Sequence, residues 1–311
     1  MNNGIILLNK KPGITSFDAL RDIKRELKTG KVGHTGTLDK FAQGLLVVLT
    51  GKALKLSQWF SNCDKKYEGR IHFGIETDTL DPEGKIIAES DLPTREKIED
   101  VLNQFIGNIL QQPPLYSAIH VNGKRASNLA RAGQTPEMKK RPVTVYKIEL
   151  KSWQPPFADI FVYCSSGTYI RSLARDIAAA AGSRGHLCKL IRTQVAGFCL
   201  ESNENEMCSD KSGVINEKCK NNVSGFLRPI DKSVIEKLGM SWFDVLPEEA
   251  EYIIHGKPLE YLLDNNPLFS PLTPHLCVNS SVYQSAAVFE GDNLIAVVEK
   301  KNGKWKYGCV I

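Results

Sequence analysis

The chain has 311 residues, of which 42% are apolar and 24% charged, and its formal net charge is +5. This length suits one large domain plus a small one, and the composition is that of a folded globular protein. No apolar run reaches the roughly 20 residues of a membrane helix, and residues 1–8 are too short for a secretory signal. We therefore expect a cytoplasmic protein that is not anchored in a membrane.

The charge is unevenly distributed along the chain. Residues 240–311 hold five lysines against nine acidic residues, a balance of −4, which leaves +9 for residues 1–239. Clusters of lysine and arginine in the first part lie within residues 10–11, 24–31, 124–131 and 139–141. Four basic clusters in one domain favour a phosphate-rich partner, so the first domain is expected to carry a nucleic-acid surface.

The first third of the chain predicts strands around one helix. Residues 5–8 form an apolar run that ends at a Lys-Lys-Pro-Gly turn, which indicates a buried strand. Thr15 stands three residues before Asp18 and offers an N-cap for a helix to about Leu27. A glycine-rich stretch follows, and the apolar run 45–49 after it is strand-like.

The middle of the chain mixes strands and helices. Alternating apolar residues and turn signals predict strands over 67–73, 143–150 and 158–164, a hairpin loop over 77–84, and helices over about 95–106 and 168–181. In the hairpin loop, Asp78, Asp81, Glu83 and Gly84 resemble part of a calcium loop. They lack that loop's ligand spacing and its closing glutamate, so we expect a solvated turn there.

The last third predicts a change of domain. Residues 200–224 are rich in Asn, Ser, Lys and Glu and indicate a flexible loop or insertion, followed by a short helix over 229–238. Three short strands separated by glycine turns are expected within 281–310. The prediction is an α+β fold with a mixed or antiparallel sheet in residues 1–238 and a small β domain in residues 239–311.

One segment combines flexible backbone with a reactive side chain. Glycines and small hydroxyl residues fill Gly33–Leu38, and Asp39 follows at the edge of the apolar strand. No Walker lysine is present, and a dinucleotide motif would need a helix where this chain has a strand, so we expect no nucleotide cofactor. The cysteines and histidines have no zinc-site spacing, and no metal is predicted.

Two other segments offer partners for Asp39. Tyr67 and Tyr169 each provide an aromatic face on which an unpaired base can stack, and Arg171 provides a planar fork that suits a carboxylate. Taken singly, each tyrosine could be a half-buried packing residue and the arginine a surface charge. Their joint meaning depends on whether the fold gathers them in one cleft.

The order and the residues of six motifs resemble those of the TruB family of pseudouridine synthases. The matching segments are 8–16, 34–39, 65–79, 112–118, 166–171 and 190–198. The resemblance covers about residues 4–198 without a break. It implies a cofactor-free isomerase that converts uridine 55 in the T arm of transfer RNA to pseudouridine.

The resemblance also implies roles for single residues. Asp39 would be the catalytic aspartate, Tyr67 would stack on the target base, and Arg171 would pair with Asp39 and keep it ionised. The pocket would further be lined by His34, Tyr169 and Leu190. Contacts to the RNA are expected from exposed basic residues, namely Lys11, Lys124, Arg125, Arg131 and Arg141.

The chain departs from the family pattern at three positions. Lys40 stands where a proline often follows the catalytic aspartate, which would change the rigidity of the loop. His120 and Ser127 replace the usual lysine and tyrosine of the middle block, which would alter RNA contacts. The C-terminal region resembles the small PUA-like domain of many members, and we expect it to be dispensable for chemistry in a monomeric enzyme.

Two other functions remain open from the residues alone. A non-catalytic RNA-binding or RNA-folding protein could keep the same scaffold, although the presence of Asp39, Tyr67 and Arg171 together argues against it. A metal-dependent nuclease or hydrolase would need a second carboxylate or a histidine cluster near Asp39, and distant residues could assemble one. Whether Asp39 attacks the ribose or the base, or removes a sugar proton, is also open.

Overall fold

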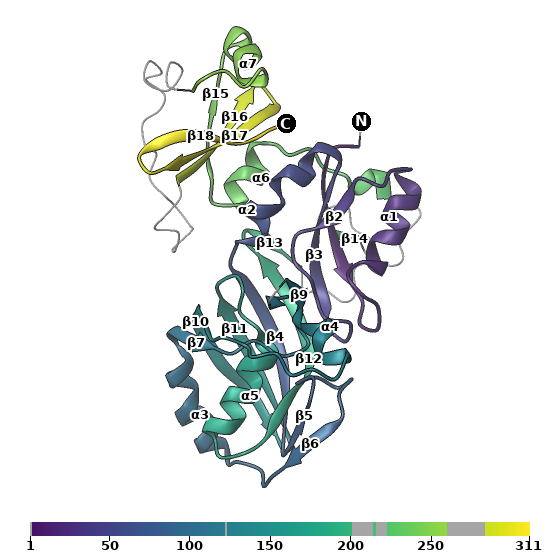
Figure 1. Ribbon diagram of the computed structural model, residues 1–311, viewed down its shortest axis with the longest axis vertical. Helices are drawn as coiled ribbons and strands as arrows, with labels where there is room; N and C mark the ends of the chain where they lie inside the picture. Colours follow the sequence, from purple (N-terminus) through teal and green to yellow (C-terminus); the bar gives the residue numbers. More distant parts are fainter. Residues whose placement is uncertain (1, 122, 201–213, 216–222, 260–283) are drawn as a thin grey trace.

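A long mixed sheet and a small second sheet organise the molecule (Figure 1). The computed structural model describes the whole chain except residues 1, 122, 201–213, 216–222 and 260–283. No helix in this described part is long and apolar enough to cross a membrane. The predicted fold class, a mixed sheet domain followed by a small C-terminal β sheet, is confirmed.

The large sheet has the strand order β14-β1-β3-β12-β4-β11-β10-β7. These strands span Val214–Ile215, Gly4–Lys10, Gln43–Thr50, Gly185–Val195, Lys65–Phe73, Phe157–Cys164, Arg141–Gln154 and Gly107–Gln111. Their pairings are antiparallel except for β14 with β1 and β12 with β3. Shorter strands are β2 (Val32–His34), β13 (Phe198–Cys199), and the hairpins β5–β6 (Ile75–Thr77, Ile86–Glu89) and β8–β9 (His120–Val121, Lys124–Arg125).

The sequence pattern of each strand matches its place in the sheet. In β4 every second residue is buried, which places Lys65, Tyr67 and Ile71 on one face, as the predicted alternation requires. In β3 seven consecutive residues are buried, because both faces of this strand are covered. The central strand β12 was not predicted, and it joins β3 to β4 so that the two predicted strands come together.

The helices cover the sheet and its ends. They are α1 (Arg21–Glu26), α2 (Ser57–Ser61), α3 (Arg95–Leu102), α4 (Ala126–Arg131), α5 (Ile170–Ala180), α6 (Lys232–Lys237) and α7 (Pro247–Ile254). Helices α3 and α5 lie side by side against the large sheet (Figure 1). Leu173, Ala174, Ile177 and Ala178 form the buried stripe of α5, at the spacing of one helical face.

Two predictions along the chain need correction. The helix expected from Thr15 to Leu27 is shorter: Thr15 Oγ1 accepts a hydrogen bond from Asp18 N at 3.1 Å as a cap does, but a 3₁₀ turn precedes α1. Most of the predicted loop or insertion, residues 200–224, lies outside the described residues. Within it, Val214 and Ile215 form the edge strand β14, because two adjacent apolar residues can be buried against β1.

The C-terminal sheet has the order β15-β16-β17-β18. Its strands span Ser241–Asp244, Gln284–Glu290, Asn293–Lys301 and Lys304–Val310, and the last three agree with the sequence prediction. Helix α7 packs on this sheet. Figure 1 shows the small sheet at one end of the molecule, next to α2 and α6.

The small sheet shares an apolar cluster with the first domain. Ala287, Phe289 and Val297 of this sheet belong to the same buried cluster as Phe60 of α2 and Leu238. The predicted domain boundary at residue 238 stays a prediction. The side chains on its two sides pack together in this cluster.

Removal of residues 239–311 should therefore destabilise the first domain. The truncated protein would expose Phe60, Leu238 and their neighbours, and each large apolar side chain is worth about 1.5–3 kcal/mol when fully buried. Thermal unfolding of the 1–238 fragment should begin at a lower temperature than that of the full chain. An unchanged unfolding temperature would mean that the two sheets fold independently.

Candidate active site

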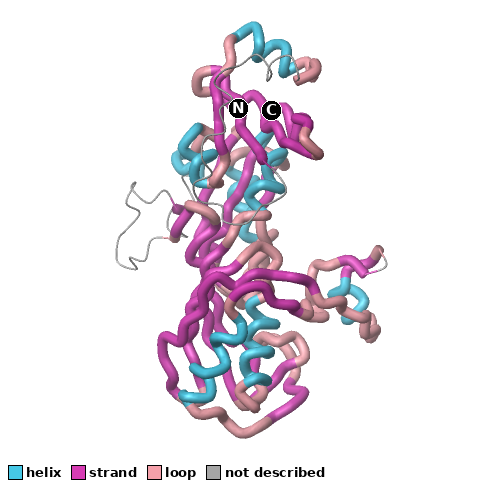
Figure 2. Tube along the Cα trace, turned by 90° about the vertical axis from the view of Figure 1, so that its left-hand side faces the viewer, coloured by secondary structure: helices cyan, strands magenta, loops and turns pink. Residues whose placement is uncertain are grey.

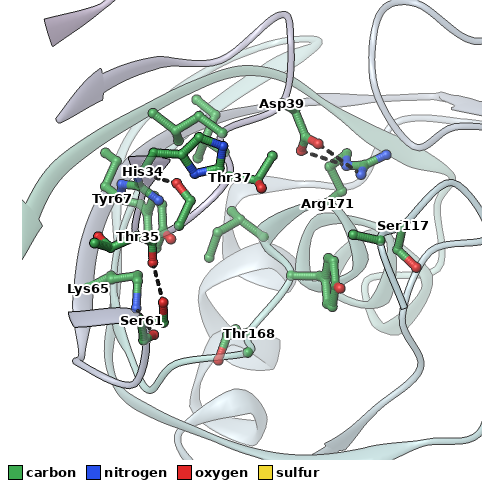
Figure 3. Close-up of a pocket in the computed structure, with 18 of the residues that line it drawn as sticks. His34, Thr35, Thr37, Asp39, Ser61, Lys65, Tyr67, Ser117, Thr168 and Arg171 are labelled. Carbon is green, nitrogen blue, oxygen red and sulfur yellow. Dashed lines mark hydrogen bonds and ion pairs between the residues drawn. The ribbon is translucent and has the colours of Figure 1, made fainter. Parts of the chain in front are cut away.

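A cavity of about 470 Å³ opens between the loop before β3, the start of β4 and the first turn of α5. Its size is that of a small-ligand site. All six residues predicted for the site line it, namely His34, Asp39, Tyr67, Tyr169, Arg171 and Leu190. Figure 3 shows Asp39 and Arg171 on one side of the cavity and His34, Tyr67 and Lys65 on the other.

The loop that carries Asp39 is fixed by buried polar contacts. Ser16 Oγ accepts a hydrogen bond from Leu38 N at 2.9 Å and donates one to Leu38 O at 3.0 Å. Thr35 N donates to Val47 O at 3.0 Å, which ties the start of the loop to β3. Leu38 itself is buried in the core beside α5. The chain therefore delivers Asp39 to the cavity in a defined position.

Arg171 holds Asp39 with two nitrogens. Arg171 Nη2 donates to Asp39 Oδ1 at 3.1 Å, and Nε lies 2.9 Å from Oδ2. Nη2 thus makes a hydrogen bond and Nε an ion-pair contact without hydrogen-bond geometry, and a planar guanidinium can approach both carboxylate oxygens in this way. The Arg171 side chain is 5% exposed, so the reading of Arg171 as a surface charge is wrong.

A second carboxylate, Asp81, contacts the same guanidinium. Arg171 Nη1 lies 3.2 Å from Asp81 Oδ2, and Nη1 and Nη2 also donate to Thr79 O and Tyr116 O at 2.8 and 3.0 Å. The predicted turn between β5 and β6 exists, but the prediction that it is solvated is wrong for Asp81, whose side chain is 9% exposed. The apolar, buried residue Leu80 beside it is the sequence signal that this turn folds inward.

The environment of Asp39 raises its pKa above the ordinary value. Asp39 lies in the wall of a concave site, and the main cause is burial, with a further contribution from the negative charge of Asp81. Arg171 opposes this shift, as the sequence implied, but it does not reverse the direction.

An activity that needs the ionised Asp39 carboxylate should consequently fail in mild acid. The carboxylate is lost as pH falls through its folded pKa, which lies above 3.8, so the acid limb of kcat/KM should lie above that pH. A pH profile measures the limb, and returning acid-treated protein to neutral pH before assay controls for unfolding. A limb at or below pH 3.8 would contradict the raised pKa.

Neighbouring strands and loops fix the positions of the aromatic residues of the site. Tyr67 is 7% exposed, and burial raises its pKa to about 12, so its hydroxyl stays protonated at neutral pH. Gln111 clamps the backbone of Tyr169, since its side chain accepts from Tyr169 N at 2.8 Å and donates to Tyr169 O at 3.1 Å. Leu190 on β12 pairs with Gly69 of β4 and is buried.

His34 enters the cavity as a neutral side chain. Burial and the positive charge of Arg192 lower its pKa. Its Nδ1 atom is buried and has no hydrogen-bond partner in the described structure. A buried polar atom without a partner is costly, and one at a cavity wall is available to a ligand.

Sequence reasoning missed two cations in the same wall. Lys65 and Arg192 both line the cavity and are 8% and 2% exposed. Both fall inside the matching motifs, but neither received a role, because a charged residue in a sequence is ordinarily expected at the surface. The residues next to them in the sequence of β4 and β12 do not indicate that these two side chains are buried.

The structure places the three departures outside the cavity wall. Lys40 Nζ forms an ion pair with Glu83 Oε1 at 3.2 Å, which links the Asp39 loop to the β5–β6 turn. Lys40 therefore restrains the Asp39 loop through this ion pair, at a position where the family often has proline. His120 lies exposed in β8 and Ser127 lies in α4, where Ser127 N donates to Ser117 O at 3.1 Å.

The predicted RNA-contact residues are all exposed. Lys124 and Arg125 form β9, Arg131 ends α4, and Arg141 begins β10. The segment with β8, β9 and α4 projects from the body as an arm (Figure 2), and its base at Tyr116–Ala118 lines the cavity. Lys11 is also exposed, next to the end of β1.

The residues near Asp39 do not resemble a metal site. Asp81 supplies the second carboxylate that a metal-dependent hydrolase would need, but Arg171 is bound between it and Asp39. Within the described residues, no group of three or more His, Cys, Asp or Glu side chains is placed to hold a metal ion.

Comparisons with known proteins agree with this site. The model of the TruB family pseudouridylate synthase N-terminal domain matches residues 24–170. A protein named tRNA pseudouridine synthase B from Borreliella burgdorferi strain ZS7 is 46% identical over 215 residues, which are 68% of this chain and 76% of that protein. One of the same name from Francisella philomiragia is 45% identical over 203 residues, 64% of this chain and 67% of that protein.

A solved structure shares the fold over nearly the whole chain. The Cbf5 chain of a Cbf5-Nop10-Gar1 complex superposes with a TM-score of 0.67 at 24% identity, covering 96% of this chain and 79% of that chain. At this identity the likeness concerns the fold alone. The fold, the matched family model and the close relatives together show that this chain belongs to the TruB family of pseudouridylate synthases.

Proposed function

We propose that this protein is a transfer RNA pseudouridine synthase that isomerises uridine 55 in the T arm. The observation that carries the proposal is the Asp39–Arg171 pair, open to a cavity of about 470 Å³ that also contains Tyr67. The relatives named tRNA pseudouridine synthase B support transfer RNA as the substrate.

The reaction needs a carboxylate and a closed pocket. The bond between uracil N1 and ribose C1′ breaks, the uracil rotates and a bond from C5 to C1′ forms. C5 then loses its proton and N1 gains one from solvent, so the product is an isomer of uridine. We assign Asp39 as the catalytic carboxylate of this sequence. No electrons are exchanged with another molecule, so the chemistry requires no redox cofactor.

The target uridine must leave its base stack to reach Asp39. Flipping a nucleotide out costs a few kcal/mol, which stacking on an aromatic ring and hydrogen bonds to the base edge offset. We assign stacking to Tyr67, whose ring borders the cavity, and lining roles to His34, Tyr169 and Leu190. Arg171 positions Asp39 by holding both of its oxygens.

We propose that the arm of β8, β9 and α4 binds the stem of the RNA. The base of the arm at Tyr116–Ala118 lines the cavity, so a stem bound to the exposed cations of the arm would present its loop to Asp39. We also expect the protein to act as a monomer in the cytoplasm, which light scattering of the purified protein and cell fractionation test.

RNA binding should depend on salt through these cations. Replacing Lys124, Arg125 and Arg131 with glutamine should lower the slope of log affinity against log salt by roughly one for each lost phosphate contact. The matched control replaces Lys300, Lys304 and Lys306 in the C-terminal sheet, which removes the same charge elsewhere. Equal slopes in the arm variant, the control and the wild type would exclude the arm as the RNA surface.

The direct test of the proposed function is a map of pseudouridine in transfer RNA. Unmodified transfer RNA treated with purified protein should gain pseudouridine at position 55, and a transfer RNA with cytidine at that position should gain none. The assay includes a chelator, which would abolish the activity of a metal-dependent enzyme. Absence of pseudouridine at position 55 would refute the proposal, and RNA cleavage would favour the hydrolase.

A further inference from the structure

The wall of the cavity opposite Asp39 holds two buried cations side by side. Lys65 and Arg192 flank Gly36: a Cβ atom added to this glycine would lie 3.4 Å from Arg192 Nη1 and 3.9 Å from Lys65 Cε. Figure 3 shows Lys65 across the cavity from the Asp39–Arg171 pair. The two cations therefore belong to a different part of the site from the catalytic carboxylate.

Both cations are held in place by backbone carbonyl groups. Lys65 Nζ donates to Ser61 O at 2.9 Å and to Cys63 O, close to the end of α2. Arg192 Nε donates to Leu45 O at 2.8 Å and Nη2 to Gly36 O at 2.9 Å. Carbonyl dipoles fix the two side chains, but they do not supply a full negative charge.

No carboxylate balances these charges by contact. Among the ion pairs formed by the described residues, none includes Lys65 or Arg192. The neighbouring carboxylate, Asp64, accepts a hydrogen bond from Tyr146 Oη at 3.2 Å, and its attraction is the weakest of the influences on Lys65. Arg171 differs in this respect, since it lies between two carboxylates.

Two buried like charges without a counter-charge are expensive to keep. Burial and the repulsion from Arg192 lower the pKa of Lys65 to about 8. Removing charges from water costs free energy that only an opposite charge or strong hydrogen bonds recover. A ligand that brings a negative charge to this wall would recover that cost, and a nucleotide brings such a charge on each phosphate.

We propose that Lys65 and Arg192 form a phosphodiester subsite for the RNA backbone beside the flipped nucleotide. This inference rests on the proposed function and adds a second anchor for the substrate. The base and ribose face Asp39, while one adjoining phosphate meets the two cations. Arg192 on β12 is the register partner of Tyr67 on β4, so the phosphate and the stacking ring would lie next to each other.

The competing explanation is that Lys65 only caps the end of α2. A lysine near a helix C-terminus does bind the last carbonyl groups. The cap alone would give Lys65 no preference among the phosphates of a bound RNA. The subsite predicts a preference for one phosphate, so the two explanations can be separated by changing the RNA.

The test neutralises single phosphates of a T-arm stem-loop. Methylphosphonate linkages are placed one at a time around the target uridine, and affinity is measured with Asp39→Asn protein so that the RNA stays unreacted. At one linkage the change should weaken binding about tenfold, the effect of losing one charge-assisted hydrogen bond. In the double variant Asp39→Asn, Lys65→Met, neutralising the same linkage should cause little further loss of affinity.

Lys66→Met is the matched control. Lys66 is the next residue of β4, and its Nζ lies on the other face of the sheet, 5.4 Å from the centre of the Tyr163 ring. This variant should keep the full penalty at the sensitive linkage. Equal penalties with and without Lys65, or no sensitive linkage, would overturn the subsite; if position 55 of transfer RNA is still converted, the proposed function stands.

A second measurement needs no substitution at Lys65. Lys65 is faced by Arg192, Cys63, Cys164 and Asp64, and its pKa of about 8 leaves it partly deprotonated near that pH. An approaching phosphate should restore the proton. Calorimetry at pH 8 in two buffers of different ionisation enthalpy should therefore show proton uptake with phosphodiester RNA and less uptake with the methylphosphonate at the sensitive linkage. Equal uptake would contradict the proposal.

Discussion

Asp39→Asn should abolish the release of tritium from C5-labelled uridine in transfer RNA while leaving RNA affinity unchanged or improved. Asparagine keeps the shape of aspartate and can still contact Arg171, but it has no charge and little nucleophilicity. Binding should survive because the change removes a negative charge from a cavity that receives RNA. Loss of turnover with intact affinity distinguishes a catalytic group from a structural one.

A matched control for this variant exists in the same sheet. Asp159 also pairs with an arginine, accepting two hydrogen bonds from Arg70 at 2.7 and 2.9 Å, and it does not line the cavity. Asp159→Asn should therefore leave tritium release intact. Turnover by folded Asp39→Asn protein at the wild-type rate would overturn the assignment of Asp39, whereas equal loss in both variants would indicate a general effect of breaking an ion pair.

Strands with regular alternation were predictable from the sequence. β4 and β11 each bury one face, so their apolar residues recur at every second position. β12 was missed because it crosses the centre of the sheet with two register shifts and carries Lys189 and Arg192 among its apolar residues. Irregular central strands depend on partners that are distant in sequence, and local periodicity does not report them.

The pairing of Asp39 with Arg171 was predictable, but the charge environment around them was not. Asp39 and Arg171 stand out because their motifs have a family counterpart. Asp81 lies in a polar turn and Lys65 in a basic run, where sequence alone favours solvent exposure. Their burial comes from the docking of the β5–β6 turn on α5 and of α2 on β4, which are tertiary contacts.

The largest effect on stability is expected from Arg171→Met. Arg171 is buried between Asp39 and Asp81, and its removal leaves the buried Asp81 without its ion-pair partner and the partly exposed Asp39 with only the weaker attraction of Lys10. Loss of one member of a buried ion pair costs about 3–5 kcal/mol. Urea unfolding at neutral pH measures this loss, and tritium release should fall with it because Asp39 is no longer held.

The source of the destabilisation can be isolated by a second substitution. In Arg171→Met protein, Asp81→Asn removes one of the two stranded charges, so the double variant should regain part of the lost unfolding free energy. Arg175→Met is the control, because Arg175 lies one turn further along α5 and pairs only with its neighbour Asp176 among the described carboxylates. Lysine at position 171 should rescue poorly, since a single ammonium cannot match the fork that binds Asp39. If Asp81→Asn added a further loss to Arg171→Met instead of relieving it, carboxylate repulsion would not be the cause, and Asp81 would have to stabilise the turn through its own hydrogen bonds to Thr79 and Glu83.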